Sequence, residues 1–246
     1  MKNLVKDLFL KVKNFLYGKN FTCLVCGRDV FDGACFCQDC KEKLAYNTVY
    51  RVRCGRKIIQ SGYCADCRQT QPKFDKARSL FVYEGEVKNL IYRLKNGEKS
   101  LAKSLAEAAM PVFTREFSDA DILTFVPMTK EREQERGYNQ SRLLAEAFAE
   151  KGKKTAVALF EKRKETAEQK ALTKAERQKN LQGSFHLKER AAVKDKRGLI
   201  VDDTLTTGAT TEELAALLHG AGVKKVYVFT VASVFYQKNK GETQKI

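Results

Sequence analysis

The sequence predicts an α/β domain with a mainly parallel sheet, preceded by a small cysteine-rich domain. Two observations lead to this prediction. From about residue 74 onward, short apolar runs typical of strands alternate with segments of helical periodicity, which is the order of elements that gives a parallel sheet with helices on both faces. All eight cysteines lie between residues 23 and 67. We therefore expect residues 1–72 to form one domain and residues 73–246 a second.

The elements of the second domain are predicted from local patterns. Apolar runs bounded by glycine, proline or polar clusters predict strands, and apolar residues three or four positions apart predict helices. We expect strands at 79–83, 122–126, 156–160, 183–187, 199–201 and 225–234, and helices at 87–95, 100–110, 141–151 and 212–219. In the first domain, residues 1–19 carry apolar side chains at helical spacing among lysines, which predicts an amphipathic helix packed on its own domain.

The charge of the chain narrows the classes of partner. Its 246 residues carry a net charge of +16. Lysine and arginine outnumber the acids by 13 to 6 over residues 1–72 and by 33 to 24 over the rest, so the excess is spread along the chain. Such an excess favours polyanions, either nucleic acid or a multiply phosphorylated ligand, although a solvated basic surface explains much of it equally well.

The apolar pattern bears on localisation. No stretch approaches 18 apolar residues, so we expect no transmembrane segment. Lysines run through residues 1–19, which therefore lack the uninterrupted apolar centre of a signal peptide. We expect a cytoplasmic protein.

The first cysteines predict a structural zinc site. Paired cysteines in a chain without a signal peptide are more typical of metal binding than of disulfides. Each C-x₂-C turn directs two thiolates to one point, and two such turns complete a tetrahedral site with no open position. The ligands of this site would be Cys23, Cys26, Cys37 and Cys40.

The following segment repeats this pattern incompletely. Cys54, Cys64 and Cys67 stand at equivalent positions, but Arg51 replaces the first cysteine of the repeat and cannot ligate zinc. The second site is therefore weak, lost or completed by Cys35. We expect a zinc ribbon with two related halves, which binds a partner or replaces the core that so short a segment cannot build.

The stretch 198–211 is the strongest candidate for a ligand site. A short strand is followed by two acids, then by hydroxyl side chains around a glycine, and then by a helix. Loop N–H groups and a helix N-terminus together bind phosphate, whereas adjacent carboxylates would repel it unless a metal ion or sugar hydroxyls lie between. A simple helix cap explains four threonines and two acids less well. The loop therefore favours a sugar phosphate with Mg²⁺, and its residues are Asp202, Asp203, Thr204, Thr206, Thr207, Gly208, Ala209 and Thr210.

This loop resembles the phosphoribosyl pyrophosphate (PRPP) loop of type I phosphoribosyltransferases, an acidic pair followed by T-T-G-x-T. The resemblance implies that Asp202 and Asp203 contact the ribose hydroxyls and Mg²⁺ at the catalytic centre, and that Thr206, Thr207, Gly208, Ala209 and Thr210 hold the 5-phosphate. Two further basic segments lie where the pyrophosphate of PRPP would need them. Arg136 follows the strand predicted at 122–126, and Arg163 and Lys164 begin a polar stretch, 161–182, that would close over the ligand or simply be a solvated loop.

The combination of motifs is similar to that of the ComF family. It consists of the cysteine-rich front end, R-G-Y-N-Q at 136–140, R-K-x-T-x₂-Q-x₂-L-x₄-R-x₂-N-x₂-G-S-F at 163–185, and D-D-T-L-T-T-G-A-T at 202–210. The chain departs from the family pattern at Arg51, at Asn96-Gly97, which shortens the usual Tyr-x-Gly, and at Thr204, which replaces an aliphatic residue.

The family resemblance implies a role in natural transformation and DNA uptake, with PRPP, single-stranded DNA and a DNA-uptake helicase as partners. Two alternatives remain open. The domain is an active phosphoribosyltransferase on an acceptor that no pattern identifies, or the zinc ribbon is an adaptor beside a vestigial pocket. The intact acids and threonines argue against decay of the pocket.

Overall fold

The computed structural model describes residues 22–31, 33–51, 53–57, 71–163, 183–188 and 191–234. The helix predicted within residues 1–19, most of the polar stretch 161–182, Lys164, Cys64 and Cys67 lie outside these ranges. In the described part of the chain, no helix has the length and apolar character that crossing a bilayer requires.

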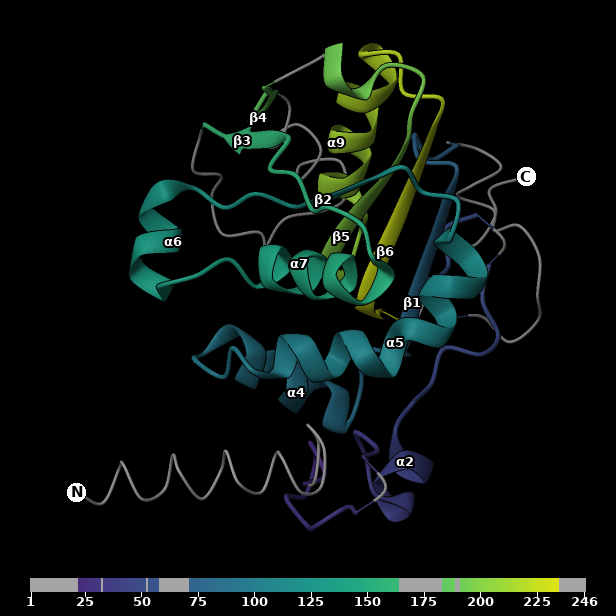
Figure 1. Ribbon diagram of the computed structural model, residues 1–246, viewed down its shortest axis with the longest axis vertical. Helices are drawn as coiled ribbons and strands as arrows, with labels where there is room; N and C mark the ends of the chain where they lie inside the picture. Colours follow the sequence, from purple (N-terminus) through teal and green to yellow (C-terminus); the bar gives the residue numbers. More distant parts are fainter. Residues whose placement is uncertain are drawn as a thin grey trace, which may run out of the picture.

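A four-stranded parallel sheet forms the centre of the molecule (Figure 1). Its strand order is β1-β6-β5-β2, with β1 at Lys76–Val82, β2 at Ile122–Phe125, β5 at Arg197–Leu205 and β6 at Lys225–Ser233. The two central strands are buried along most of their length, which explains their almost continuous apolar runs. The predicted mainly parallel α/β fold is confirmed.

Helices cover both faces of this sheet. α4 (Glu86–Lys95), α5 (Leu101–Phe117) and α7 (Gln140–Gly152) lie on one side, and α9 (Ala209–Gly220) lies on the other (Figure 1). Successive side chains of β5 point to opposite faces of the sheet, so Leu199 and Val201 belong to one apolar cluster and Ile200 to the other. A short loop joins the carboxyl end of β5 to the start of α9, and this loop is the one predicted to bind phosphate.

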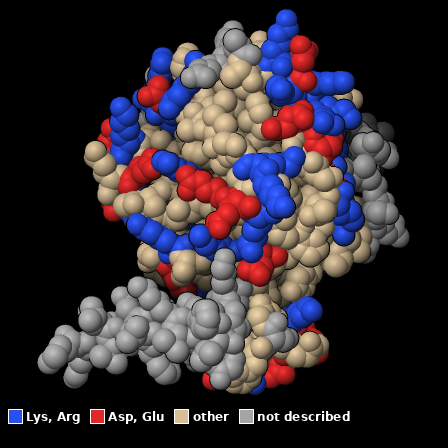
Figure 2. Space-filling model, in the orientation of Figure 1, with Lys and Arg blue, Asp and Glu red and all other residues tan. Residues whose placement is uncertain are grey.

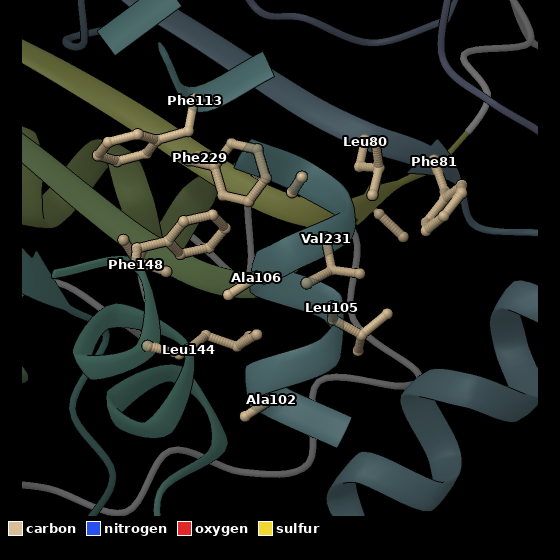
Figure 3. Packing of buried hydrophobic residues seen from close by; sticks show 14 of the residues in the cluster. Leu80, Phe81, Ala102, Leu105, Ala106, Phe113, Leu144, Phe148, Phe229 and Val231 are labelled. Carbon is tan, nitrogen blue, oxygen red and sulfur yellow. The ribbon is translucent and has the colours of Figure 1, made fainter. Parts of the chain in front are cut away.

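The larger core is built around aromatic side chains (Figure 3). The ring of Phe148 stacks on Phe113 at 5.3 Å between centroids and meets Phe229 edge-on at 4.8 Å. Phe113 comes from the part of α5 that the sequence did not predict. We expected this helix to end at residue 110, before Pro111, but it continues to Phe117. Burial of Phe113 and Phe117 four positions apart offsets the hydrogen bond that proline removes.

The same core extends into the cysteine-rich segment. Its buried residues pack in one cluster with Leu80, Phe81 and the α4 and α5 side chains, and they are Cys23, Val30, Cys35, Phe36, Cys40 and Leu44. Short helix α2 (Gln38–Lys43) belongs to this segment. Arg93 of α4 also donates a hydrogen bond to Leu24 O at 2.5 Å. The described cysteine-rich residues are therefore anchored on the α/β domain, and the division at residue 72 stays a prediction.

One predicted strand is displaced. Residues 156–160 were expected to form a strand, but Ala156 makes only an isolated bridge to Leu123, and β3 occupies Phe160–Lys162. β3 pairs antiparallel with β4 (Phe185–Leu187) in a separate two-stranded sheet, and a 3₁₀ turn follows at Ala191–Val193. Val157 is exposed, so the apolar run that favoured a buried strand here is only partly buried.

Candidate functional site

The acid pair lies at the carboxyl end of β5. Asp203 is buried, with 4% of its surface exposed, and its Oδ2 lies 2.8 Å from the ammonium of Lys95 at the end of α4. Asp202 Oδ1 accepts hydrogen bonds from the Ser141 hydroxyl at 2.6 Å and from the Asp203 N–H at 2.9 Å. β5, α4 and α7 thus converge on the two carboxylates.

The two carboxylates of the acid pair lie beside a single ammonium, that of Lys95. Burial, and then the charge of adjacent Asp203, raise the pKa of Asp202 to about 8. Burial opposes the charge of Lys95, yet the pKa of this ammonium is raised because Asp203 and Asp202 lie beside it. One lysine therefore does not compensate both carboxylates. A cation or a hydroxyl-bearing ligand would complete the site.

Asp202→Asn should flatten the pH dependence of folding stability. The pKa of Asp202 rises from 3.8 to about 8 on folding, so between these values the folded chain holds a proton that the unfolded chain has released. Its contribution to stability is complete below about pH 4 and is lost as the pH rises through about 8. The slope from this group is at most about 1.4 kcal/mol per pH unit. Urea denaturation of both proteins from pH 5 to 9 measures it, and parallel curves would contradict the assignment.

The predicted phosphate loop connects β5 to α9. Thr204 is still part of the strand, and its hydroxyl is buried without a hydrogen-bond partner in the described residues. Thr206 and Thr207 form the bend, and Gly208 takes a left-handed conformation (φ 83°) as the N-cap of α9. Ala209 and Thr210 open the helix. Gly208 brings no capping side chain, and the Ala209 N–H donates to Thr207 Oγ1 at 3.4 Å. The first turn of α9 therefore directs N–H groups and the positive end of its dipole to this loop.

A cavity of about 470 Å³ adjoins the acid pair through Lys95. It is lined by Lys95, Asn96, Gly97, Arg132, Glu135 and Arg136. Arg136 thus lies on the same cavity wall as Lys95, and its Nη1 donates to Gln140 Oε1 at 2.9 Å. Three cationic side chains against one carboxylate make this cavity suited to an anion.

The two arginines of the lining come from a helix that the sequence did not predict. No helix was predicted between the strand at 122–126 and the helix at 141–151, but residues Lys130–Arg136 form α6. The hydroxyl of Thr129 accepts from Arg132 N at 3.4 Å, and left-handed Gly137 (φ 77°) ends the helix. Asn139 then caps α7 and donates to Val126 O at 3.0 Å. This turn fixes the chain between the end of β2 and the start of α7.

Tyr138 contacts the turn at Asn96 and Gly97, which lines the cavity. Its hydroxyl donates to Leu94 O at 2.5 Å and accepts from Gly97 N at 2.8 Å, so it holds the shortened Asn96-Gly97 turn. Tyr138→Phe should cost about 1–2 kcal/mol of unfolding free energy, because a buried carbonyl and an N–H lose their partner. Urea denaturation checks this, and an unchanged midpoint would show that water replaces the hydroxyl.

Arg163 is not joined to the acid pair by a contact within the described residues. It follows β3, its guanidinium pairs with Glu161 at 3.5 Å, and its N–H bonds to Ser184 O. Sequence reasoning missed four residues of the site instead. Arg132 lines the cavity, Lys95 and Ser141 contact the acid pair, and Nη2 of Arg56 donates to Thr207 O. No local pattern marks Lys95 or Arg56, whereas Ser141 directly follows the R-G-Y-N-Q motif at 136–140.

The four cysteines of the first block come together. Their sulfur atoms all lie within 4.8 Å of one another, and those of Cys26 and Cys37 are 3.7 Å apart. The side chain of Arg28 lowers the pKa of Cys26 to about 6, whereas burial and the three other cysteines raise that of Cys40 to about 12. Four thiolates do not coexist here without a central cation, so the cluster could hold a metal ion.

The second set of cysteines is described only in part. Cys54 is buried in the smaller apolar cluster. Cys35 is also buried, its thiol donates to Ser104 O at 3.2 Å, and burial raises its pKa to about 11. These conditions favour a neutral thiol at Cys35. Its role in a second metal site stays a prediction.

The comparisons with known proteins bear on the domain that carries this site. Residues 138–245 match the family of phosphoribosyl transferase domains. Together with the parallel sheet and the loop before α9, the match defines a protein with a phosphoribosyltransferase-type α/β domain.

Several known proteins are similar to this chain over most of its length. Competence protein F of Haemophilus influenzae is 28% identical over 228 residues, 87% of this chain and 97% of that protein. DNA utilization protein YhgH of Salmonella typhimurium is 29% identical over 84% of this chain and 88% of its own length. Competence protein ComFC of Bacillus subtilis is 27% identical over 79% and 82%, respectively. The resemblance to the ComF family is thereby confirmed.

Proposed function

We propose that this chain is a ComF-type factor in natural transformation and DNA uptake, and that its phosphoribosyltransferase-like domain binds PRPP with Mg²⁺. The observation that carries the ligand assignment is that buried Asp203 pairs with Lys95, which lines the cationic cavity, and shortly precedes a phosphate-type loop along the chain. A sugar bearing phosphates at both ends matches these three features in order.

The parts of the ligand would be held as follows. Asp202 and Asp203 accept hydrogen bonds from the ribose hydroxyls and supply oxygen ligands near Mg²⁺. The loop from Thr206 to Thr210 and the N-terminus of α9 hold the 5-phosphate. The pyrophosphate occupies the cavity beside Arg132 and Arg136.

Lys95 would take part in both the ribose site and the pyrophosphate site. Its ammonium pairs with Asp203 and also lines the cavity. When Mg²⁺ and ribose hydroxyls compensate Asp203, Lys95 becomes available to the pyrophosphate. The ion pair thus keeps the empty pocket stable while leaving a cation ready for the ligand.

The surface is suited to a polyanion such as single-stranded DNA. The net charge is +16, and lysine and arginine side chains are distributed over the face in Figure 2 with acidic side chains among them. Two of the relatives are named competence proteins and a third a DNA utilization protein. A DNA-uptake helicase is the protein partner that the family resemblance implies.

We propose zinc as the metal of the cysteine cluster. Ligand distances of about 2.3 Å in a tetrahedral Zn–S site place the sulfurs about 3.8 Å apart. The separation of 3.7 Å between the Cys26 and Cys37 sulfurs fits that geometry. With four protein ligands the ion would be structural, and its role would be to hold the segment that packs on α4 and α5.

Calorimetric titration of the full chain tests the proposal. PRPP should bind more tightly with Mg²⁺ than without it, and single-stranded DNA should bind with an affinity that falls as salt rises, because phosphate contacts release counterions. If PRPP fails to bind in either condition, the ligand assignment is wrong. If DNA binding is absent or independent of salt, the DNA-handling role is wrong.

A further inference from the structure

Arg56 connects the cysteine-rich segment to the phosphate loop. Its Nη2 donates to the carbonyl oxygen of Thr207 at 2.5 Å, across 151 positions of sequence. A Cβ built on Gly208 would lie 3.5 Å from the same nitrogen, so the guanidinium rests directly against the loop. Among the hydrogen bonds of the described residues, this contact joins the loop to the front end of the chain.

The turn that carries Arg56 is fixed in place. Gly55 is left-handed (φ 64°) and approaches β1 so closely that a Cβ would lie 2.2 Å from Ala77 O. Asn47 Nδ2 donates to Gly55 O at 2.7 Å, and Ala77 N donates to Arg53 O at 2.7 Å. Glycine is therefore required at position 55, and Arg56 extends from a turn that is held against β1.

The contact of Arg56 with Thr207 O also sets the direction of the Gly208 N–H, which belongs to the same peptide bond. No peptide bond of the described residues is cis. In a trans peptide the carbonyl oxygen and the following N–H point in opposite directions. Because Arg56 holds the oxygen of Thr207, the N–H of Gly208 points away from Arg56 to the other side of the loop. Arg56 thus determines where this N–H is directed.

We propose that Arg56 is a positioning residue, through which residues 53–57 of the cysteine-rich segment orient the phosphate-binding N–H groups of the loop. This inference rests on the proposed function, since it names how the same pocket is held ready. Arg56 acts from behind the loop and does not itself touch the ligand. Phosphate binding and the conformation of the turn at 53–57 are therefore coupled, and coupling free energy is reciprocal.

The test compares Arg56→Ala and Arg56→Lys with Lys57→Ala in the full chain. Lys57→Ala removes the same charge at the next position, where the ammonium pairs with Glu84 at 3.8 Å. Calorimetry with ribose 5-phosphate should show about 10-fold weaker binding for Arg56→Ala, since one charge-assisted contact is misdirected. Arg56→Lys should recover most of the loss, because lysine also donates to Thr207 O. Lys57→Ala should stay within about twofold of the unsubstituted chain.

Two further measurements separate positioning from general destabilisation. The amide signal of Gly208 in a ¹⁵N–¹H spectrum should shift on adding ribose 5-phosphate, and this shift should shrink in Arg56→Ala, whereas affinity for pyrophosphate alone should be unchanged. Ribose 5-phosphate should also slow hydrogen exchange of the Gly55 N–H, which bonds to Arg51 O at 2.9 Å. Gly55→Ala, which would push the turn off β1, should reproduce the weaker binding of Arg56→Ala.

The outcomes are distinct. If the unsubstituted chain binds neither ribose 5-phosphate nor PRPP, the proposed function fails and this inference with it. If it binds and Arg56→Ala binds equally well, only the role of Arg56 is overturned. Equal weakening of ribose 5-phosphate and pyrophosphate binding would likewise overturn it, because the effect would not be confined to the loop.

Discussion

Asp203→Asn should reduce the affinity of the full chain for PRPP by at least about 100-fold, since each contact between a carboxylate and its partner is worth about 1.5–3 kcal/mol and Asp203 would serve both ribose and Mg²⁺. The affinity that remains should no longer respond to Mg²⁺. The substitution also leaves the ammonium of Lys95 without its partner at 2.8 Å. This change should lower the unfolding free energy of the empty protein by about 1–3 kcal/mol, because Lys95 is partly exposed and water compensates part of the loss. Calorimetry and urea denaturation measure the two effects.

Glu146→Gln is the matched control. It removes one negative charge from α7, where Glu146 forms an exposed i,i+4 pair with Arg142 at 2.7 Å. Such a pair contributes only a few tenths of a kcal/mol, so binding and stability should both stay close to those of the unsubstituted chain. Retention of Mg²⁺-dependent PRPP binding by Asp203→Asn would show that the ligand does not use the acid pair.

The sequence predicted the parts of this molecule that depend on local pattern. Short apolar runs located both central strands, and the order strand, acids, threonines, glycine, helix identified the region around α9. The C-x₂-C spacing identified the four sulfurs that lie within 4.8 Å. In each case the residues that define the feature are close together along the chain.

The parts that could not be predicted depend on distant partners. Pro111 appeared to end α5, but burial of Phe113 and Phe117 against β6 and α7 keeps the helix continuous. Lys95 reads as the polar end of an amphipathic helix, and its role follows only from Asp203 lying beside it. Arg56 is 151 positions from Thr207. No periodicity in a single sequence contains that information.

Removing the metal ion that we propose for the cysteine cluster should destabilise the α/β domain as well as the segment that would bind the ion. Cys23 and Cys40 are buried in one apolar cluster with Phe36, Leu44 and Phe81, so this corner of the core depends on the cluster remaining closed. Without a cation, the thiols of this cluster would have to be neutral or repel one another. We expect chelation or Cys40→Ser to cost on the order of 4 kcal/mol and to lower the melting temperature by about 10 °C.

Cys35→Ser is the control for this experiment. It alters a buried cysteine of the same segment whose thiol donates to Ser104 O, a bond that a serine hydroxyl can also make. Metal content per chain, measured together with thermal unfolding, should fall by one ion in Cys40→Ser. A loss of one ion in Cys35→Ser, with the first site retained, would assign Cys35 to a second site. Full metal content in Cys40→Ser would show that the ion is held elsewhere, and the stability of the core would then have to come from the apolar contacts alone.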